Sequence, residues 1–191
     1  MQLRADARAN RERIVAAARA TFAEKGLEAE VREIAERAGV AVGTLYRHFP
    51  SKDDLLTAIA RDALTVAVAE ARAAESMEDP IAGLRALLVQ EFAEIVRYGW
   101  LAEALFTGRL PTASWAEILA AAEDARYAER FERLIRRAVD RGRLRPDLDI
   151  AAAAALLAGV GAPWNRRRLP AERTAEQAAD AVMAVFLHGA T

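Results

Sequence analysis

The segment from Val31 to Lys52 constrains the fold more than any other stretch of this 191-residue chain. Its first part places apolar residues on one helical face, and its last part places Leu45 and Phe49 four residues apart. A glycine, Gly39, separates the two parts and accepts the positive φ that a sharp turn requires. The pattern therefore predicts two short helices joined by a tight turn, a helix-turn-helix.

The second helix of this motif predicts a surface as well as a core. If Leu45 and Phe49 face inward, the residues around them face outward, and no acidic residue occurs from Arg37 to Lys52. A DNA duplex would meet only neutral or basic groups there. Two short amphipathic helices also describe an ordinary helical hairpin, so periodicity alone leaves a purely structural role open.

A family resemblance rests on the same stretch, which reads IAERAGVAVGTLYRHFPSK from residue 34 to residue 52. Together with the segments 13–18 and 22–26, it resembles the signature of the TetR/AcrR family of transcriptional regulators. The resemblance covers residues 10 to 60, and the rest of the chain agrees only in length and helical character. It departs at Ala41, where the family often has a capping serine, and in the segment 26–30, which is one residue shorter and lacks the usual Ser or Thr.

The resemblance and the outward face of the second helix select the same DNA-contacting residues. These are Val42, Gly43, Thr44, Tyr46, Arg47, His48 and Lys52. Val42, Gly43 and Arg47 lie where base edges can be reached, and the other four are expected to position the DNA backbone. Arg47 is the expected guanine reader. The basic stretch before residue 14 is left open as either a solvated tail or an arm that reaches a DNA groove.

Composition favours an all-α protein without a metal or cofactor. Aromatic residues make up 6% of the chain, alanine is abundant, and no stretch alternates β-branched residues as a strand would. There is no cysteine and there are two histidines, so neither disulfides nor a metal cluster are expected. A net charge of −1 requires any DNA affinity to come from a local patch. Without an apolar run of about 18 residues, no membrane span is expected and the protein is placed in the cytoplasm.

The expected architecture has about nine helices in two domains. Residues 1–55 should form a three-helix DNA-binding domain with the helix-turn-helix, and residues 56–191 a helical domain for effector binding and dimerisation. In addition to the second helix of the helix-turn-helix, which carries Leu45 and Phe49, capping and periodicity predict helices over 10–25, 31–38, 51–75, 79–99, 100–107, 114–142, 150–161 and 171–187. The fourth helix should open with a capping box of Ser51 and Asp54.

The last two helices predict a homodimer. The segment 150–161 is nearly free of charge, and a helix that is apolar on all sides must be covered on all sides. A four-helix bundle from two chains would cover it, as the family resemblance also implies, although both helices could instead be internal core. The expected interface residues are Ala155, Leu156, Gly159, Ala175, Ala179, Val182 and Phe186.

A small-molecule pocket is expected within residues 84–131, where aromatic and polar residues mingle. A largely apolar effector would suit such a lining, although the same aromatics would also suit a plain core. The expected lining residues are Leu88, Phe92, Tyr98, Trp100, Phe106, Trp115, Tyr127 and Phe131.

The sequence thus predicts a ligand-responsive regulator that binds a pseudo-palindromic operator as a dimer and is released by an effector. Repression is the usual case in the resembled family. A small helical enzyme is disfavoured because no catalytic constellation is present. An adaptor that uses its helix-turn-helix to bind protein remains a third interpretation, and a gel-shift experiment with DNA would separate it from the regulator.

Overall fold

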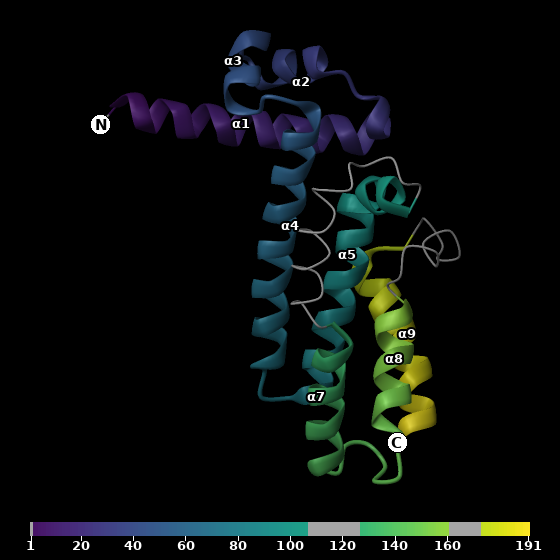
Figure 1. The fold of residues 1–191 in the computed structure, drawn as a ribbon. Helices are drawn as coiled ribbons and strands as arrows, with labels where there is room; N and C mark the ends of the chain where they lie inside the picture. The colour runs from purple at the N-terminus through teal and green to yellow at the C-terminus, as the bar shows by residue number, and fades with distance from the viewer. Residues whose placement is uncertain (1, 107–126, 161–172) are drawn as a thin grey trace. The chain divides into compact units, whose positions relative to one another are not determined.

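The computed structural model describes residues 2–106, 127–160 and 173–191 of the chain (Figure 1). These residues form eight α-helices and a short 3-10 helix, with no strand among them, which confirms the all-α fold class. The elements are α1 (Gln2–Lys25), η1 (Gly26–Glu28), α2 (Val31–Ala38), α3 (Val42–His48), α4 (Lys52–Glu75), α5 (Pro80–Phe106), α7 (Tyr127–Asp140), α8 (Ile150–Val160) and α9 (Ala175–Ala190).

The described residues form two compact units, each with its own apolar core. The first unit contains Met1–Leu64 together with the end of α5 from Tyr98 onward. The second contains Thr65–Arg97 together with α7, α8 and α9. The domain boundary expected after residue 55 falls inside α4, which is one continuous helix, so α4 and α5 each contribute residues to both units.

The helix-turn-helix forms where the sequence predicts it. Gly39 ends α2 in the left-handed region with φ of 65°, and its N–H donates to the Glu36 carbonyl at 3.0 Å. At the other end of α2, the Glu33 carboxylate accepts from the Glu30 N–H at 3.3 Å, in place of the usual Ser or Thr cap. Ala41 precedes α3 without any side-chain cap, as its methyl group requires.

The core of the first unit holds α3 in place through Leu45 and Phe49, which are 1% and 3% exposed. Part of this core comes from α5, because the Trp100 ring stacks on Phe22 of α1 with ring centroids 4.9 Å apart. Tyr98 is buried in the same cluster. The DNA-binding motif is therefore completed by residues about 50 positions further along the chain.

The start of α4 carries the predicted capping box. The Ser51 hydroxyl accepts from the Asp54 N–H at 3.1 Å, and the Asp54 carboxylate accepts from the Ser51 N–H at 3.0 Å. Two N–H groups at the start of the helix are thereby satisfied, which fixes the point at which the chain leaves the helix-turn-helix.

Three helix boundaries differ from the sequence prediction. The first helix begins at Gln2 instead of residue 10, so the basic lead-in is helical, and α9 begins at Ala175 instead of residue 171. The helix expected to end near Gly99 continues as α5 to Phe106. Burial of Tyr98 and Trp100 on both sides of Gly99 outweighs the roughly 1 kcal/mol that a glycine costs inside a helix. Of the helix expected over 114–142, the structure describes α7, and the loop 108–113 lies outside the described residues.

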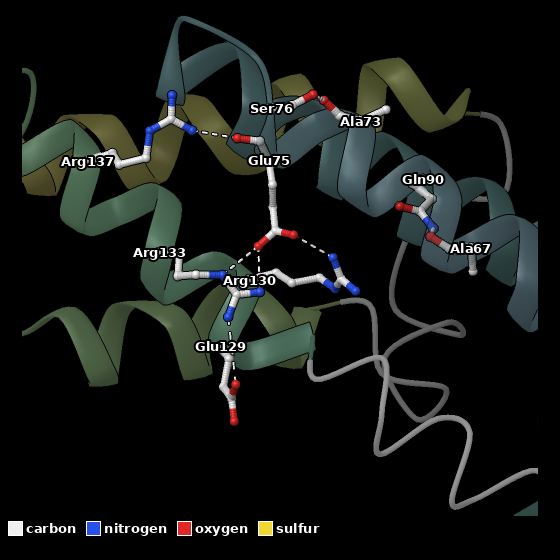
Figure 2. Close-up of polar contacts among 9 residues, drawn as sticks. All are labelled: Ala67, Ala73, Glu75, Ser76, Gln90, Glu129, Arg130, Arg133 and Arg137. Atoms are coloured by element: carbon white, nitrogen blue, oxygen red, sulfur yellow. Dashed lines mark hydrogen bonds and ion pairs between the residues drawn. The ribbon is translucent and has the colours of Figure 1, made fainter.

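In the second unit, the end of α4 is anchored to α7 by a cluster of arginines around Glu75 (Figure 2). The Glu75 carboxylate lies 2.5 Å from Arg130, whose side chain is 7% exposed, and 2.5 Å from Arg133. Arg137 donates to the Glu75 carbonyl at 2.5 Å and to the Met77 carbonyl at 2.8 Å. These bonds satisfy the last carbonyls of α4 and neutralise a buried guanidinium.

We predict that Glu75→Ala destabilises the protein by about 2 to 4 kcal/mol, because it removes a carboxylate that is bound to the buried Arg130 guanidinium and to Arg133. Urea unfolding followed by circular dichroism measures the loss. The control is Asp180→Ala, which breaks the exposed Arg85–Asp180 pair, where N and O are 2.5 Å apart. The control should lose much less, because solvent screens exposed pairs. Equal losses in the two variants would contradict a special role for the Glu75 cluster.

Candidate nucleic-acid interface and effector site

The outward face of α3 carries six of the seven expected DNA contacts. Val42 and Tyr46 are 38% and 46% exposed, although large apolar and aromatic side chains usually lie inside. Gly43 and Arg47 are exposed as well, while Thr44 and His48 are half-buried at the edges of the face. The side chains of α3 are thus divided as the four-residue spacing predicts, and the surface they form is available for a duplex.

Several basic residues of the first unit are already bound to carboxylates of the same unit. Arg37 donates to both carboxylate oxygens of Glu24, at 2.8 and 2.6 Å, and this bond lowers the pKa of Glu24. Lys25 pairs with Glu33, whose pKa is lowered in the same way. These cations position α1 against α2, so they contribute little positive potential to the DNA-facing side.

Lys52, which is expected to contact the DNA backbone, is bound within the first unit. Its ammonium group donates to the Leu27 carbonyl and lies 5.7 Å from the centroid of the Phe22 ring. Both interactions are with the unit's own chain and tie the start of α4 to η1. A variant at Lys52 would therefore change the stability of the fold together with any DNA contact.

The residues expected to line a ligand pocket are divided between the two cores. Leu88, Phe92 and Phe131 are buried in the second unit, whereas Tyr98 and Trp100 belong to the core of the first. Trp115 and the side chains of Phe106 and Tyr127 lie outside the described part of the structure. The structure thus brings three of the eight expected residues, Leu88, Phe92 and Phe131, into the core of the second unit.

Glu91 in α5 is an unusual polar group of the second unit. Its Oε2 atom is excluded from solvent and has no hydrogen-bond partner among the residues that the structure describes, although Glu91 as a whole is half-buried. Burial raises the pKa of this carboxyl well above its ordinary value. One helical turn earlier lie Leu87 and Leu88, both fully buried. The sequence offers only one signal for such a site, namely an acidic residue among the apolar positions of a helix.

An apolar groove of about 710 Å³ runs between α8 and α9. Leu156 and Val185, which are 63% and 78% exposed, lie on its walls, and Phe186 lies among its lining residues. The lining also includes exposed or half-buried small and apolar residues that lie outside the expected interface set, because the sequence alone does not orient two helices that are both rich in alanine. Among them are Ala152, Ala181, Val185 and Gly189.

The other expected interface residues are divided among the groove, the exposed surface and the core of the second unit. Val182 is half-buried and lines the groove, whereas Ala155 is exposed but outside it. Ala179 is fully buried in the core of its own chain, and Ala175 packs against that core. Gly159 is half-buried, and a side-chain atom added there would meet no other atom.

Two other kinds of site do not occur among the described residues. Their histidine, aspartate and glutamate side chains form no group suited to a metal ion. None of the helices over 2–106, 127–160 and 173–191 is both long and apolar enough to cross a membrane.

Comparison with known proteins shows the family to which the chain belongs. Residues 14–59 match the model of bacterial regulatory proteins of the tetR family. The HTH-type transcriptional repressor KstR2 of Mycobacterium tuberculosis is 30% identical over 186 residues, which cover 91% of this chain and 89% of that protein. The chain belongs to the TetR family.

Solved structures of TetR-family regulators agree with this assignment over nearly the whole chain. PfmR from Thermus thermophilus is similar with a TM-score of 0.73 and 25% identity, covering 92% of this chain and 97% of PfmR. The ketosteroid transcriptional regulator KstR2 of Mycobacterium tuberculosis is similar with a TM-score of 0.70 and 26% identity, covering 95% and 94% of the two chains.

The protein is therefore a ligand-responsive, DNA-binding transcriptional regulator. TetR-family regulators bind DNA operators and small-molecule effectors, and the family is not an enzyme family. Within this TetR-family chain, the outward face of α3 is the candidate reading surface.

We predict that Arg47→Ala weakens binding to the specific operator by about 1 to 3 kcal/mol and relaxes the preference at one base pair of each half-site. Affinity measured on a panel of single-base operator variants would show this effect. Val66→Ala serves as a control, because Val66 is exposed on α4 away from α3. A uniform loss on every duplex would mean that Arg47 binds phosphate and does not read a base.

Proposed function

We propose that this TetR-family regulator is a repressor that binds a pseudo-palindromic operator as a homodimer and dissociates when a small-molecule effector binds. In this proposal residues 1–55 read DNA, and residues 56–191 bind the effector and the second subunit. The observation that carries it is the outward face of α3, where Arg47 and Tyr46 are exposed on a helix held from behind by Leu45 and Phe49.

A recognition helix of seven residues contacts only a few base pairs, so affinity requires two copies. In a two-fold symmetric dimer, the two copies of α3 would enter successive major grooves on one side of the duplex. Their centres would then lie one turn of DNA apart, about 34 to 36 Å. The groove between α8 and α9 supports dimerisation, because its exposed Leu156 and Val185 form an apolar surface in the described part of the chain.

The effector is proposed to bind in the second unit next to Glu91. A buried carboxylic acid kept neutral by its surroundings donates one hydrogen bond, which suits an apolar molecule with a carbonyl or hydroxyl oxygen. Leu88 and Phe92, both on α5, would supply apolar contacts. KstR2 is described as a ketosteroid regulator, and a polycyclic ketone fits the same chemistry.

Release of DNA is proposed to pass through α4, which contains residues of both units. An effector changes operator affinity only through its differential affinity for the two states of the dimer, and couplings of about 1 to 3 kcal/mol give roughly 5- to 150-fold effects. The protein would have no catalytic activity of its own, and as a DNA-binding repressor it would act in the cytoplasm, where the bacterial chromosome lies.

The decisive experiment is selection of bound sequences from a random duplex library by the purified protein. Enrichment of an inverted repeat with half-sites one helical turn apart is the expected result. An adaptor that binds protein through its helix-turn-helix, or a small helical enzyme, would enrich no sequence. Enrichment of a single unpaired half-site would contradict the dimer and leave the DNA-binding part intact.

We predict that Ala152→Glu converts the dimer to a monomer and lowers operator affinity at least tenfold, because it places a charge in the apolar groove. Analytical ultracentrifugation measures the change. Ala151→Glu is the matched control, since Ala151 is exposed on α8 and does not line the groove. The control should remain dimeric, and thermal unfolding should show that both variants are folded. Two dimeric variants would show that the groove is not the interface.

We also predict that Glu91→Gln stabilises the protein at neutral pH and removes part of its pH dependence. A carboxyl whose folded-state pKa is raised contributes stability below its unfolded pKa, and this stability is lost as pH rises toward the folded pKa. Wild type and variant should thus be equally stable near pH 4 and diverge at higher pH. Urea unfolding from pH 4 to pH 8 tests this, with Glu94→Gln as the control, because Glu94 lies 3.9 Å from Arg97.

A further inference from the structure

A second basic element lies beside the recognition helix, on α1. The Arg11 guanidinium lies over the Phe49 ring, 5.3 Å from its centroid, and Phe49 is the residue that ends α3. On the other side of α1, Arg13 lies beside the turn, because a Cβ added to Gly39 would be 3.9 Å from its Nη1 atom. The two arginines therefore flank the two ends of α3, and Figure 1 shows the first turns of α1 extending beyond α2 and α3.

The placement of Arg11 leaves its hydrogen-bonding groups available. A guanidinium held over an aromatic ring by a cation–π contact keeps its N–H donors for other partners, because the ring offers no hydrogen-bond acceptor atom. Arg11 is exposed, and no carboxylate of the described residues forms an ion pair with it. Arg8, one turn earlier, differs because it pairs with Glu12 at 3.6 Å.

Several other cations of the first unit are engaged with their own chain. Arg37 is held by Glu24, Lys25 by Glu33, and Lys52 by the Leu27 carbonyl. A phosphate that approached any of them would compete with an existing partner. Arg11 can bind a phosphate without giving up an ion pair with a carboxylate of the described residues. Two parallel N–H donors of a guanidinium also match the spacing of two phosphate oxygens.

We propose that Arg11 binds a phosphate of the operator backbone and that its cation–π contact with Phe49 fixes this phosphate contact relative to α3. The partner is duplex DNA of any sequence, because a phosphate contact positions the protein without reading bases. The contact would add to those expected from α3 and Lys52, and it would give α1 a part in docking the recognition helix. It rests on the DNA binding of the family and adds a residue outside α2, α3 and α4.

The test compares Arg11→Gln, Arg11→Lys and wild type by fluorescence anisotropy with a labelled operator duplex and a scrambled duplex, from about 50 to 200 mM KCl. Each phosphate contact contributes about 0.9 to the slope of log affinity against log salt. Arg11→Gln should make the slope of log affinity against log salt shallower by about 0.9 per monomer on both duplexes. The ratio of wild-type affinity to variant affinity should therefore fall about threefold to fourfold per contact between the lowest and the highest salt concentration. Arg11→Lys should keep the slope and bind more weakly, since lysine lacks the planar donors.

Arg72→Gln is the matched control for net charge, because Arg72 is exposed near the end of α4. It should leave the slope unchanged. An equal change in Arg72→Gln would overturn the proposal in favour of a net-charge effect. An unchanged slope in Arg11→Gln with a lowered thermal midpoint would also overturn it, because Arg11 would then only support Phe49. If wild type binds neither duplex, the proposed DNA target itself is wrong, which is a separate outcome.

Discussion

The burial of Leu45 and Phe49 is the constraint on which the rest of the first unit depends. A helix of seven residues without a side-chain cap has too few internal hydrogen bonds to be stable alone, since isolated helices shorter than about 12 residues are marginal in water. Its conformation is therefore imposed by the core beneath it. Because two of its residues face that core, the remaining ones must face outward, and the reading surface follows from packing.

That core is not local to the helix-turn-helix. Trp100 stacks on Phe22, and Lys52 reaches toward the other parts of the same cluster from the start of α4. Substitutions in α5 can thus alter the support of α3 without contacting DNA. This dependence explains why α5 continues through Gly99, a residue that would favour a helix end in an isolated peptide.

Local signals made much of the fold predictable from sequence. The turn at Gly39 and the box of Ser51 and Asp54 depend on residues within four positions of one another, and both form as predicted. Alternation of buried and exposed residues in α3 is equally local. Helix ends such as Gln2 were missed because the basic segment before residue 14 carries no regular apolar pattern.

Tertiary contacts decided what the sequence could not. An aromatic residue fits any core, so Tyr98 and Phe92, six positions apart on one helix, could not be assigned to different units. Lys52 is basic and near α3, yet only the folded chain brings the Leu27 carbonyl within reach of it. In α8 and α9, apolar residues occur on most faces, so periodicity could not distinguish the buried Ala179 from the exposed Val185.

The anchoring of α4 gives its length a mechanical consequence. The helix has 24 residues and is therefore about 36 Å long, and its last turn is bound to α7 through Glu75, Arg130 and Arg137. A rotation of about 5° around that anchored end would move the first turn of α4 by about 3 Å. The capping box at Ser51 joins this first turn directly to the residues that follow α3. In the proposed homodimer, a displacement of this size would change the spacing of the two recognition helices, with no change inside the helix-turn-helix itself.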